Sequence, residues 1–171
     1  LTEPEEPGVC SVSLSPDGGL IAIGGSRSAD DAGYVKLWDV PSGRQLQTLE
    51  GHTRPIYSVA FSPDGQQVAS GGGSQDSAVA VWDAENGTAL ATFPVPSRPG
   101  ALSTGIASLD FSPTGLLAVG GLLMSTGYPV PGSATDVWRL EDETVVHSFG
   151  GSNVSFSADG TRLLSGAVVR E

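Results

Sequence analysis

The 171-residue sequence predicts an all-β protein built from small antiparallel sheets that repeat along the chain. Three observations carry this prediction. Short runs alternate apolar and polar residues, which indicates strands with one buried face. Asp-Gly pairs follow several of these runs, and such pairs suit tight reversals between strands. A turn motif recurs with a period near 45 residues and a tryptophan recurs between its copies, which is typical of one structural unit used several times.

The most complete copy of this unit covers residues 51–93. Its first strand is followed by the turn Ser62-Pro63-Asp64-Gly65, in which Pro is preset for an early turn position. The four expected strands are Ile56–Phe61, Gln67–Gly71, Ala78–Trp82 and Thr88–Phe93. Joined by short turns, they form one antiparallel sheet.

Both motifs recur with a regular spacing. The turn returns as Leu14-Ser15-Pro16-Asp17-Gly18, Phe111-Ser112-Pro113-Thr114-Gly115 and Phe156-Ser157-Ala158-Asp159-Gly160. Successive copies are 47, 50 and 45 residues apart. The tryptophan strand is written Leu37-Trp38-Asp39, Val81-Trp82-Asp83 and Val137-Trp138-Arg139. With Gly51-His52 opening a repeat and Trp-Asp closing it, nearly the whole chain resembles the WD-repeat β-propeller family.

The resemblance implies a partial propeller of four-stranded blades, three full and about half of a fourth. The expected boundaries are 4–49 for blade one, 51–93 for blade two, 101–149 for blade three and 151–171 for partial blade four. In blade three, a long loop at Leu122–Ser133 separates the strands Leu116–Gly121 and Ala134–Leu140. Blade four reaches Glu171 just as its third strand is due to begin.

Three arrangements of these blades stay open, since four to eight blades close a propeller. The chain is a segment of a larger propeller, usually seven-bladed in the family. Alternatively, Leu1–Glu3 supplies an outer strand to blade four and closes a four-bladed ring. In the third arrangement, two copies associate to complete one propeller. An unclosed arc leaves apolar faces and strand edges exposed, which favours association.

Composition narrows the classes of partner. Eight Lys and Arg against nineteen Asp and Glu give a net charge of −11. Nucleic-acid and anionic membrane surfaces need clustered basic residues, so neither is an expected partner. Cys10 is the single cysteine, which excludes an intrachain disulfide and a thiolate metal cage. We expect its side chain to pack, and we expect no metal and no cofactor.

Four residues of blade two match the hydrogen-bonded structural tetrad of the family. They are His52, Ser70, Asp76 and Trp82. The indole N–H needs a buried acceptor, which a serine hydroxyl supplies, and the imidazole can join that hydroxyl to the carboxylate. Ser, His and Asp also suggest a hydrolase triad. A serine held inside a sheet has no nucleophile elbow, so we predict a structural role and no catalytic residues.

The tetrad is incomplete in the other blades. Ile23 and Val119 occupy the position of Ser70 in blades one and three, while Ser165 matches it in blade four. Gly132 stands at the position of Asp76 in blade three, and no histidine aligns with His52 in either blade. Trp38 and Trp138 therefore lack their usual partners, and we predict that these blades rely more on apolar packing.

The family resemblance also implies one face that gathers the longer loops and binds proteins or peptides. Asp30 and Asp31, with the acidic N-terminal segment, are candidates for steering a basic segment of a partner. Leu122, Leu123, Met124 and Tyr128 are candidates for an apolar anchor. The alternatives are a solvated acidic surface and a loop that folds back on its own blade.

The expected function is a non-catalytic protein-interaction scaffold. Two other functions stay open: a regulatory or sensory appendage of a larger enzyme, and a propeller hydrolase with a site at the central channel. The hydrolase needs convergent His and carboxylates from several blades. Asp110 is the one charged residue among the expected inner strands, which disfavours that site.

Overall fold

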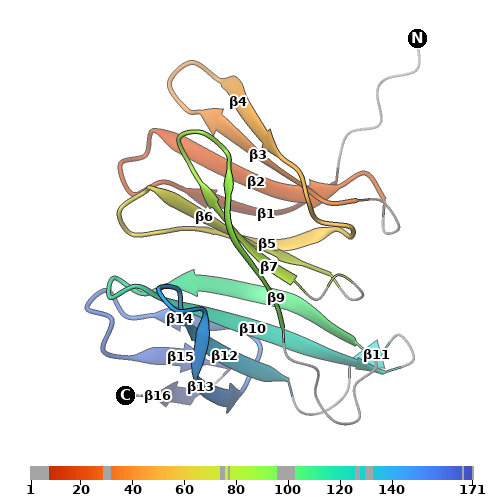
Figure 1. The fold of residues 1–171 in the computed structure, drawn as a ribbon, viewed down its shortest axis with the longest axis vertical. Coiled ribbons are helices and arrows are strands. Elements are labelled where there is room, and N and C mark those ends of the chain that lie inside the picture. Colours follow the sequence, from red (N-terminus) through yellow and green to blue (C-terminus); the bar gives the residue numbers. More distant parts are fainter. Residues whose placement is uncertain are drawn as a thin grey trace.

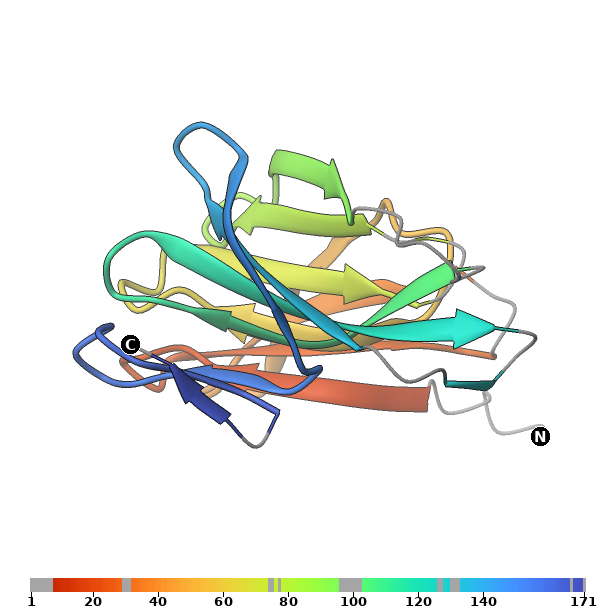
Figure 2. The same cartoon turned by 90° about the horizontal axis from the view of Figure 1, so that it is seen from below.

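The structure is a computed structural model that describes residues 8–28, 32–73, 76, 78–95, 103–125, 128–129, 133–166 and 168–170. Within these ranges the chain forms strands and turns and contains no helix (Figure 1). The predicted all-β fold of repeated antiparallel sheets is confirmed. Blades one to three follow one another along the long axis of the molecule in chain order (Figure 1), and blade four lies beside blade three and not beyond it (Figures 1 and 2).

Blades one and two are four-stranded sheets in which each strand pairs with the next in sequence. Blade one consists of β1 (Gly8–Leu14), β2 (Leu20–Ser26), β3 (Tyr34–Asp39) and β4 (Arg44–Leu49). Blade two consists of β5 (Ile56–Phe61), β6 (Gln67–Gly72), β7 (Ala78–Asp83) and β8 (Ala89–Pro94). All pairs are antiparallel, as the short turns require.

Blades three and four depart from the expected pattern in two places. Blade three consists of β9 (Ser103–Phe111), β10 (Leu116–Ser125), β11 (Tyr128–Pro129), β12 (Ala134–Arg139) and β13 (Thr144–Gly150). Blade four consists of β14 (Val154–Phe156), β15 (Leu163–Ser165) and β16 (Val168–Arg170). The third strand of blade four is thus present as β16, whereas the sequence predicted that the chain stops before it.

The second departure corrects the expected long loop of blade three. Leu122–Ser125 is not a loop but the continuation of β10, and residues 122–124 pair with residues 103–105 of β9. Residues 124 and 125 pair in addition with β11. The ladder satisfies backbone groups that a loop would leave to solvent, and no Gly or Pro interrupts Leu122–Ser125.

The turn between the first and second strands has the same hydrogen bonds in three blades. In blade one, Asp17 Oδ1 accepts from Ser15 Oγ at 2.6 Å and from the Gly19 N–H at 2.9 Å. The Ser15 hydroxyl, followed by the Gly19 amide, holds the Asp17 pKa below its usual value. Gly18 takes a φ of 72°, a left-handed conformation that favours glycine. Asp64 and Asp159 repeat this arrangement.

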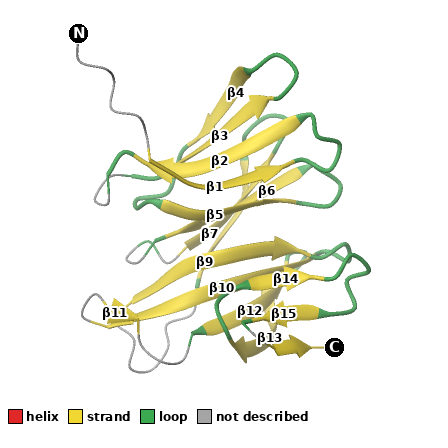
Figure 3. Cartoon of the chain, turned by 180° about the vertical axis from the view of Figure 1, so that it is seen from behind, coloured by secondary structure: helices red, strands yellow, loops and turns green. Residues whose placement is uncertain are grey.

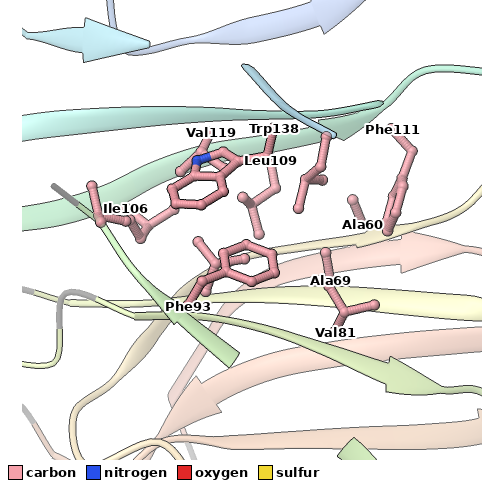
Figure 4. Packing of buried hydrophobic residues seen from close by; sticks show 12 residues of the cluster. Ala60, Ala69, Val81, Phe93, Ile106, Leu109, Phe111, Val119 and Trp138 are labelled. Atoms are coloured by element: carbon pink, nitrogen blue, oxygen red, sulfur yellow. The ribbon is translucent and has the colours of Figure 1, made fainter. Parts of the chain in front are cut away.

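Adjacent blades pack face to face through apolar side chains. Between blades two and three, Phe93 stacks on Trp138 with ring centroids 4.8 Å apart (Figure 4). The labelled side chains around this pair come from both sheets and include Ile106, Leu109 and Val119. Burial of such side chains removes apolar area from water and is the main stabilising term between blades.

First strands of neighbouring blades lie next to each other and are linked by hydrogen bonds, which we call rungs. In each rung, a backbone N–H of one first strand donates to a side-chain oxygen of the preceding first strand. The rungs are Val59 to Ser11 (3.1 Å), Phe61 to Ser13 (3.1 Å), Leu109 to Ser58 (3.0 Å), Val154 to Ser108 (3.2 Å) and Phe156 to Asp110 (2.6 Å).

The outward face of β1 has no blade against it among the described residues. Val12 and Leu14 are 58% and 55% exposed there. Val59 and Phe61, at the same positions of β5, are buried against blade one. The face of β1 is therefore the surface that a preceding blade covers elsewhere in this fold. Blade four does not cover this face, so the described residues do not form a closed four-bladed ring, whereas the other two arrangements remain compatible with it.

Candidate functional site

The structure brings together the four residues of the blade-two tetrad. Trp82 Nε1 donates to Ser70 Oγ at 2.8 Å. Ser70 Oγ lies 2.8 Å from His52 Nε2, and His52 Nδ1 lies 2.6 Å from Asp76 Oδ2. The residues come from β7, β6 and the segments before β5 and β7, so the network ties the loops of the blade to its central strands. The backbone N–H of Thr53 also donates to Asp76.

The direction of each hydrogen bond follows from what each group can do. An indole N–H only donates and a carboxylate only accepts. With a neutral imidazole, His52 Nδ1–H donates to Asp76, and Nε2 accepts the hydroxyl proton of Ser70. Ser70 is 0% exposed, so no substrate atom can reach its oxygen. This arrangement suits a structural network and not a nucleophile, which must be exposed to its substrate.

The corresponding tryptophans of blades one and three have a different environment. Trp38 Nε1 and Trp138 Nε1 are buried without a hydrogen-bond partner among the described residues. The cause is visible in the sequence, because Ile23 and Val119 offer no acceptor where blade two has Ser70. A buried N–H without a partner costs about 1–3 kcal/mol. Blade three therefore holds its tryptophan mainly by packing, including the stack on Phe93.

A hydrolase site at the central channel would have to use polar side chains of the inner strands. In the structure these side chains form hydrogen bonds between neighbouring blades. Asp110 accepts the Phe156 N–H at 2.6 Å. Burial raises the pKa of Asp110, while the Phe156 amide and the Ser155 hydroxyl oppose that rise. The serines that form the other rungs are likewise bonded to the next blade. These side chains link one blade to the next.

Each first strand of blades one to three carries a β-bulge. The register shifts leave one residue out of the ladder in each blade, and these residues are Cys10, Tyr57 and Ala107. A bulge re-aims a side chain that strict alternation would place on the other face. Cys10 is exposed, which corrects the expectation that it packs.

Tyr57 is a candidate contact residue that the sequence interpretation missed. It is 46% exposed at the end of blade two where β4 connects to β5 and β6 to β7, which we call the loop-bearing end. Its ring lies over Gly73, where a Cβ atom would come within 2.9 Å of Tyr57 Cε2. A tyrosine near the start of a first strand, next to the expected longer loops, is the signal that could have identified it.

The structure does not place the predicted partner-binding side chains. Asp30 and Asp31 lie outside the described residues. Leu122, Leu123 and Met124 have a described backbone in β10, and Tyr128 in β11, but their side chains lie outside the described part. Their role in binding stays a prediction. The backbone places these residues in the paired strands β10 and β11 and not in an irregular loop.

The described residues were also compared with the requirements of a metal site and of a membrane-spanning helix. No group of three or more His, Cys, Asp or Glu among them is placed to hold a metal ion. In the same part of the chain, no helix is long and apolar enough to span a membrane.

Comparison with known proteins identifies the family to which these repeated sheets belong. The family model "WD domain, G-beta repeat" matches residues 1–39 and 43–83, the region of blades one and two. The chain belongs to the WD-repeat family. The repeated four-stranded sheets of the structure agree with this membership, and blades three and four extend it beyond the matched residues.

The relatives found among curated proteins are much longer than this chain. A periodic tryptophan protein 2 homolog of Neurospora crassa is 25% identical over 97% of this chain and 19% of its own length. The Schizosaccharomyces pombe homolog is 30% identical over 67% of this chain and 12% of its own length. Eukaryotic translation initiation factor 3 subunit I of Candida albicans is 35% identical over 53% of this chain and 24% of its length. The chain thus spans less than a quarter of each of these relatives.

Proposed function

We propose that this WD-repeat chain is a non-catalytic scaffold that binds a protein or peptide through the loop-bearing end of its blades. The proposal rests on one observation: the polar side chains that could form a catalytic site are hydrogen-bonded within or between the blades. Ser70, His52 and Asp76 bond one another inside blade two, and Asp110 bonds the backbone of blade four. Groups held in this way stabilise the blades and leave the loop-bearing end as the surface that can vary.

Tyr57 is the described residue that best suits contact with a partner at this end. Tyrosine combines a large apolar ring with a hydroxyl and is enriched at protein interfaces. Its position in a bulge frees it from packing inside the blade, while Gly73 beneath it keeps the ring in place. One relative, a translation initiation factor subunit, is by its name part of a larger assembly, which supports an interaction role.

Site-specific photo-crosslinking tests this proposal. The photoreactive residue p-benzoylphenylalanine replaces Tyr57 in one variant and Leu90 in another, and both variants are irradiated in extract of the organism that makes the protein. Leu90 is 50% exposed on β8, on the opposite side of the blade sheet from the first strand, and serves as the matched control. The expected result is one crosslinked protein at position 57 that is absent at position 90.

Competition makes the result specific. Excess unlabelled chain should abolish the crosslink, and excess Tyr57→Ala chain should compete more weakly. Equal crosslinking at both positions, or equal competition by both chains, would contradict binding through the loop-bearing end.

A further inference from the structure

The turns between first and second strands lie at the opposite end of the blades, on one side of the molecule (Figure 3). Neighbouring turns touch through a proline and a glycine. A Cβ atom on Gly65 would lie 3.4 Å from Pro16 Cδ, and one on Gly160 would lie 3.0 Å from Pro113 Cγ. These contacts close the junctions between blades one and two and between blades three and four.

The junction between blades two and three lacks this contact. A Cβ atom on Gly115 would meet nothing within 4 Å, although blade two lies beside it. The turn of blade three is one residue shorter than the others, because the Ser112 N–H donates to Leu116 O where Ser62 donates to Gln67. It also carries Thr114 in place of the turn aspartate. A shorter turn reaches less far toward its neighbour.

A second link is missing at the same junction. Ser13 and Asp110 form rungs to Phe61 and Phe156, but the equivalent residue of β5 is Ala60, which has no side-chain oxygen. Ala60 packs against Phe111 in the apolar cluster instead (Figure 4). Blades two and three are thus joined by the Ser58 rung and by apolar packing but separate toward their turns.

A groove of about 680 Å³ occupies this separation. Its volume lies within the range of about 300–1,000 Å³ that is common for ligand sites. Phe111, Leu116 and Leu140 contribute apolar surface, together with the prolines of the two turns. Asp64 lines the groove on the side of blade two, and Arg139 and Glu141 line it on the side of blade three.

The charge in and around this groove is negative. Arg139 forms an ion pair with Asp142, with Nη1 3.0 Å from Oδ2, so its charge is already compensated. The Ser62 hydroxyl and Gln66 amide hold the Asp64 pKa below its usual value, so this carboxylate is charged at neutral pH. Both of those donors use Oδ1. Asp64 and the exposed Glu141 thus place two carboxylates along the groove.

We propose that this groove binds a short peptide segment of a partner protein, with one Arg or Lys side chain beside an apolar residue. The basic group would lie between Asp64 and Glu141, and the apolar residue would lie on Phe111, Leu116 and Leu140. Charge complementarity argues for this occupant, since two carboxylates flank an apolar floor. The groove lies at the end of the blades opposite to Tyr57, so this site is independent of the loop-bearing end.

Binding of a defined probe to the 171-residue chain tests the proposal. The probe is the fluorescein-labelled peptide Gly-Leu-Arg-Leu-Gly, and its affinity is measured by fluorescence anisotropy. We expect Glu141→Lys to weaken binding by about fivefold or more, since an attraction becomes a repulsion. Glu85→Lys is the matched control, because Glu85 occupies the same turn position in blade two, outside the groove. It should leave the affinity unchanged.

Two further measurements separate groove binding from general attraction to an acidic protein. A peptide with citrulline in place of Arg should bind at least about fivefold more weakly, because citrulline has no charge. Backbone amide chemical shifts of Thr114 and Gly115 should change on titration with the arginine peptide. Equal weakening by both lysine variants, equal affinity of the citrulline peptide, or shifts confined to the loop-bearing end would each overturn the proposal.

Discussion

Blades two and three each have a tryptophan at the same position of the sheet, and the two side chains are held in different ways. Trp82 donates to Ser70, and the network continues through His52 to Asp76. Trp138 has no such acceptor among the described residues, and its ring stacks on Phe93 of the preceding blade. The first arrangement links the loops of a blade to its own strands. The second links one blade to another.

The difference shows that the tryptophan position does not depend on one kind of interaction. In blade two a buried polar network must be complete, because each unpaired member would cost desolvation energy. In blade three one indole N–H has no partner in the described part of the chain, and apolar contacts between blades offset the cost. Breaking the polar network should therefore destabilise blade two strongly, whereas removing the indole N–H of blade three should cost no hydrogen bond among the described residues.

The largest effect is expected for His52→Ala. The change leaves the Ser70 hydroxyl and the Asp76 carboxylate without their shared partner and opens a cavity, which should lower the free energy of unfolding by about 2–4 kcal/mol. His147→Ala is the control, since His147 is exposed on β13 and should cost about 0.5 kcal/mol or less. Urea denaturation measures both. Equal stability of the two variants would show that the tetrad contributes nothing.

Tryptophan-to-phenylalanine substitutions compare the two blades directly. Trp82→Phe removes the donor to Ser70, whereas Trp138→Phe removes an N–H that has no described partner. Both variants lose similar ring area. We expect Trp82→Phe to be more destabilising by about 1 kcal/mol, measured by the same urea denaturation. A greater loss for Trp138→Phe would mean that its N–H has a partner of equal value.

Ala60→Ser should restore the missing rung between blades two and three. A hydroxyl at this position can accept the Phe111 N–H, as Ser13 accepts that of Phe61. We expect a gain of about 0.5–1 kcal/mol in the free energy of unfolding. The control is Ala69→Ser in the same cluster, where burial of a hydroxyl should destabilise. The rung hypothesis fails if the two serines have the same effect in thermal melts.

The smallest effect is expected at Asp110 and depends on pH. Because burial raises its pKa, the native state holds the Asp110 proton more tightly than the unfolded chain does. Its carboxylate therefore lowers stability as the pH rises through the raised pKa. Asp110→Asn keeps an acceptor for Phe156 and should be more stable than the parent at pH 7, with the difference vanishing below the unfolded pKa.

Asp39→Asn should change the stability at neutral pH in the opposite direction. The Ser42 hydroxyl and amide lower the Asp39 pKa, so this carboxylate stabilises above its unfolded value of about 3.8 and loses the contribution as the pH falls. Melts between pH 3 and pH 7 should show that Asn costs stability at position 39 and adds it at position 110. The same sign at both positions would contradict the pKa directions.

Much of the fold follows from local sequence. The turn motif at Ser62-Pro63-Asp64-Gly65 and the strand at Trp82 predict β5, β6 and β7 to within one residue. Alternation and turn chemistry decide such elements, because both act over a few neighbouring residues. The spacing of the repeat likewise groups the four tetrad residues between His52 and Trp82, and the hydrogen bonds of blade two join all four.

The features that escaped prediction depend on contacts between distant segments. Leu122–Ser125 belongs to a strand because β9 and β11 pair with it. Tyr57 and Cys10 lie at register shifts of the ladder, which alternation alone does not reveal, and Cys10 is exposed on a strand that no described blade covers. The shorter turn at Gly115 can be counted in the sequence, but the open junction beside it depends on how neighbouring blades pack.

The bulges at Cys10, Tyr57 and Ala107 have a consequence for how such a protein evolves. Each of these three blades holds one such position in its first strand, outside the ladder of hydrogen bonds. Three very different side chains occupy it in three blades of one fold. Selection can therefore change the chemistry presented there one blade at a time, while the rungs and the apolar clusters keep the scaffold constant. The residues that join the blades and the residues at the bulges are therefore separate sets.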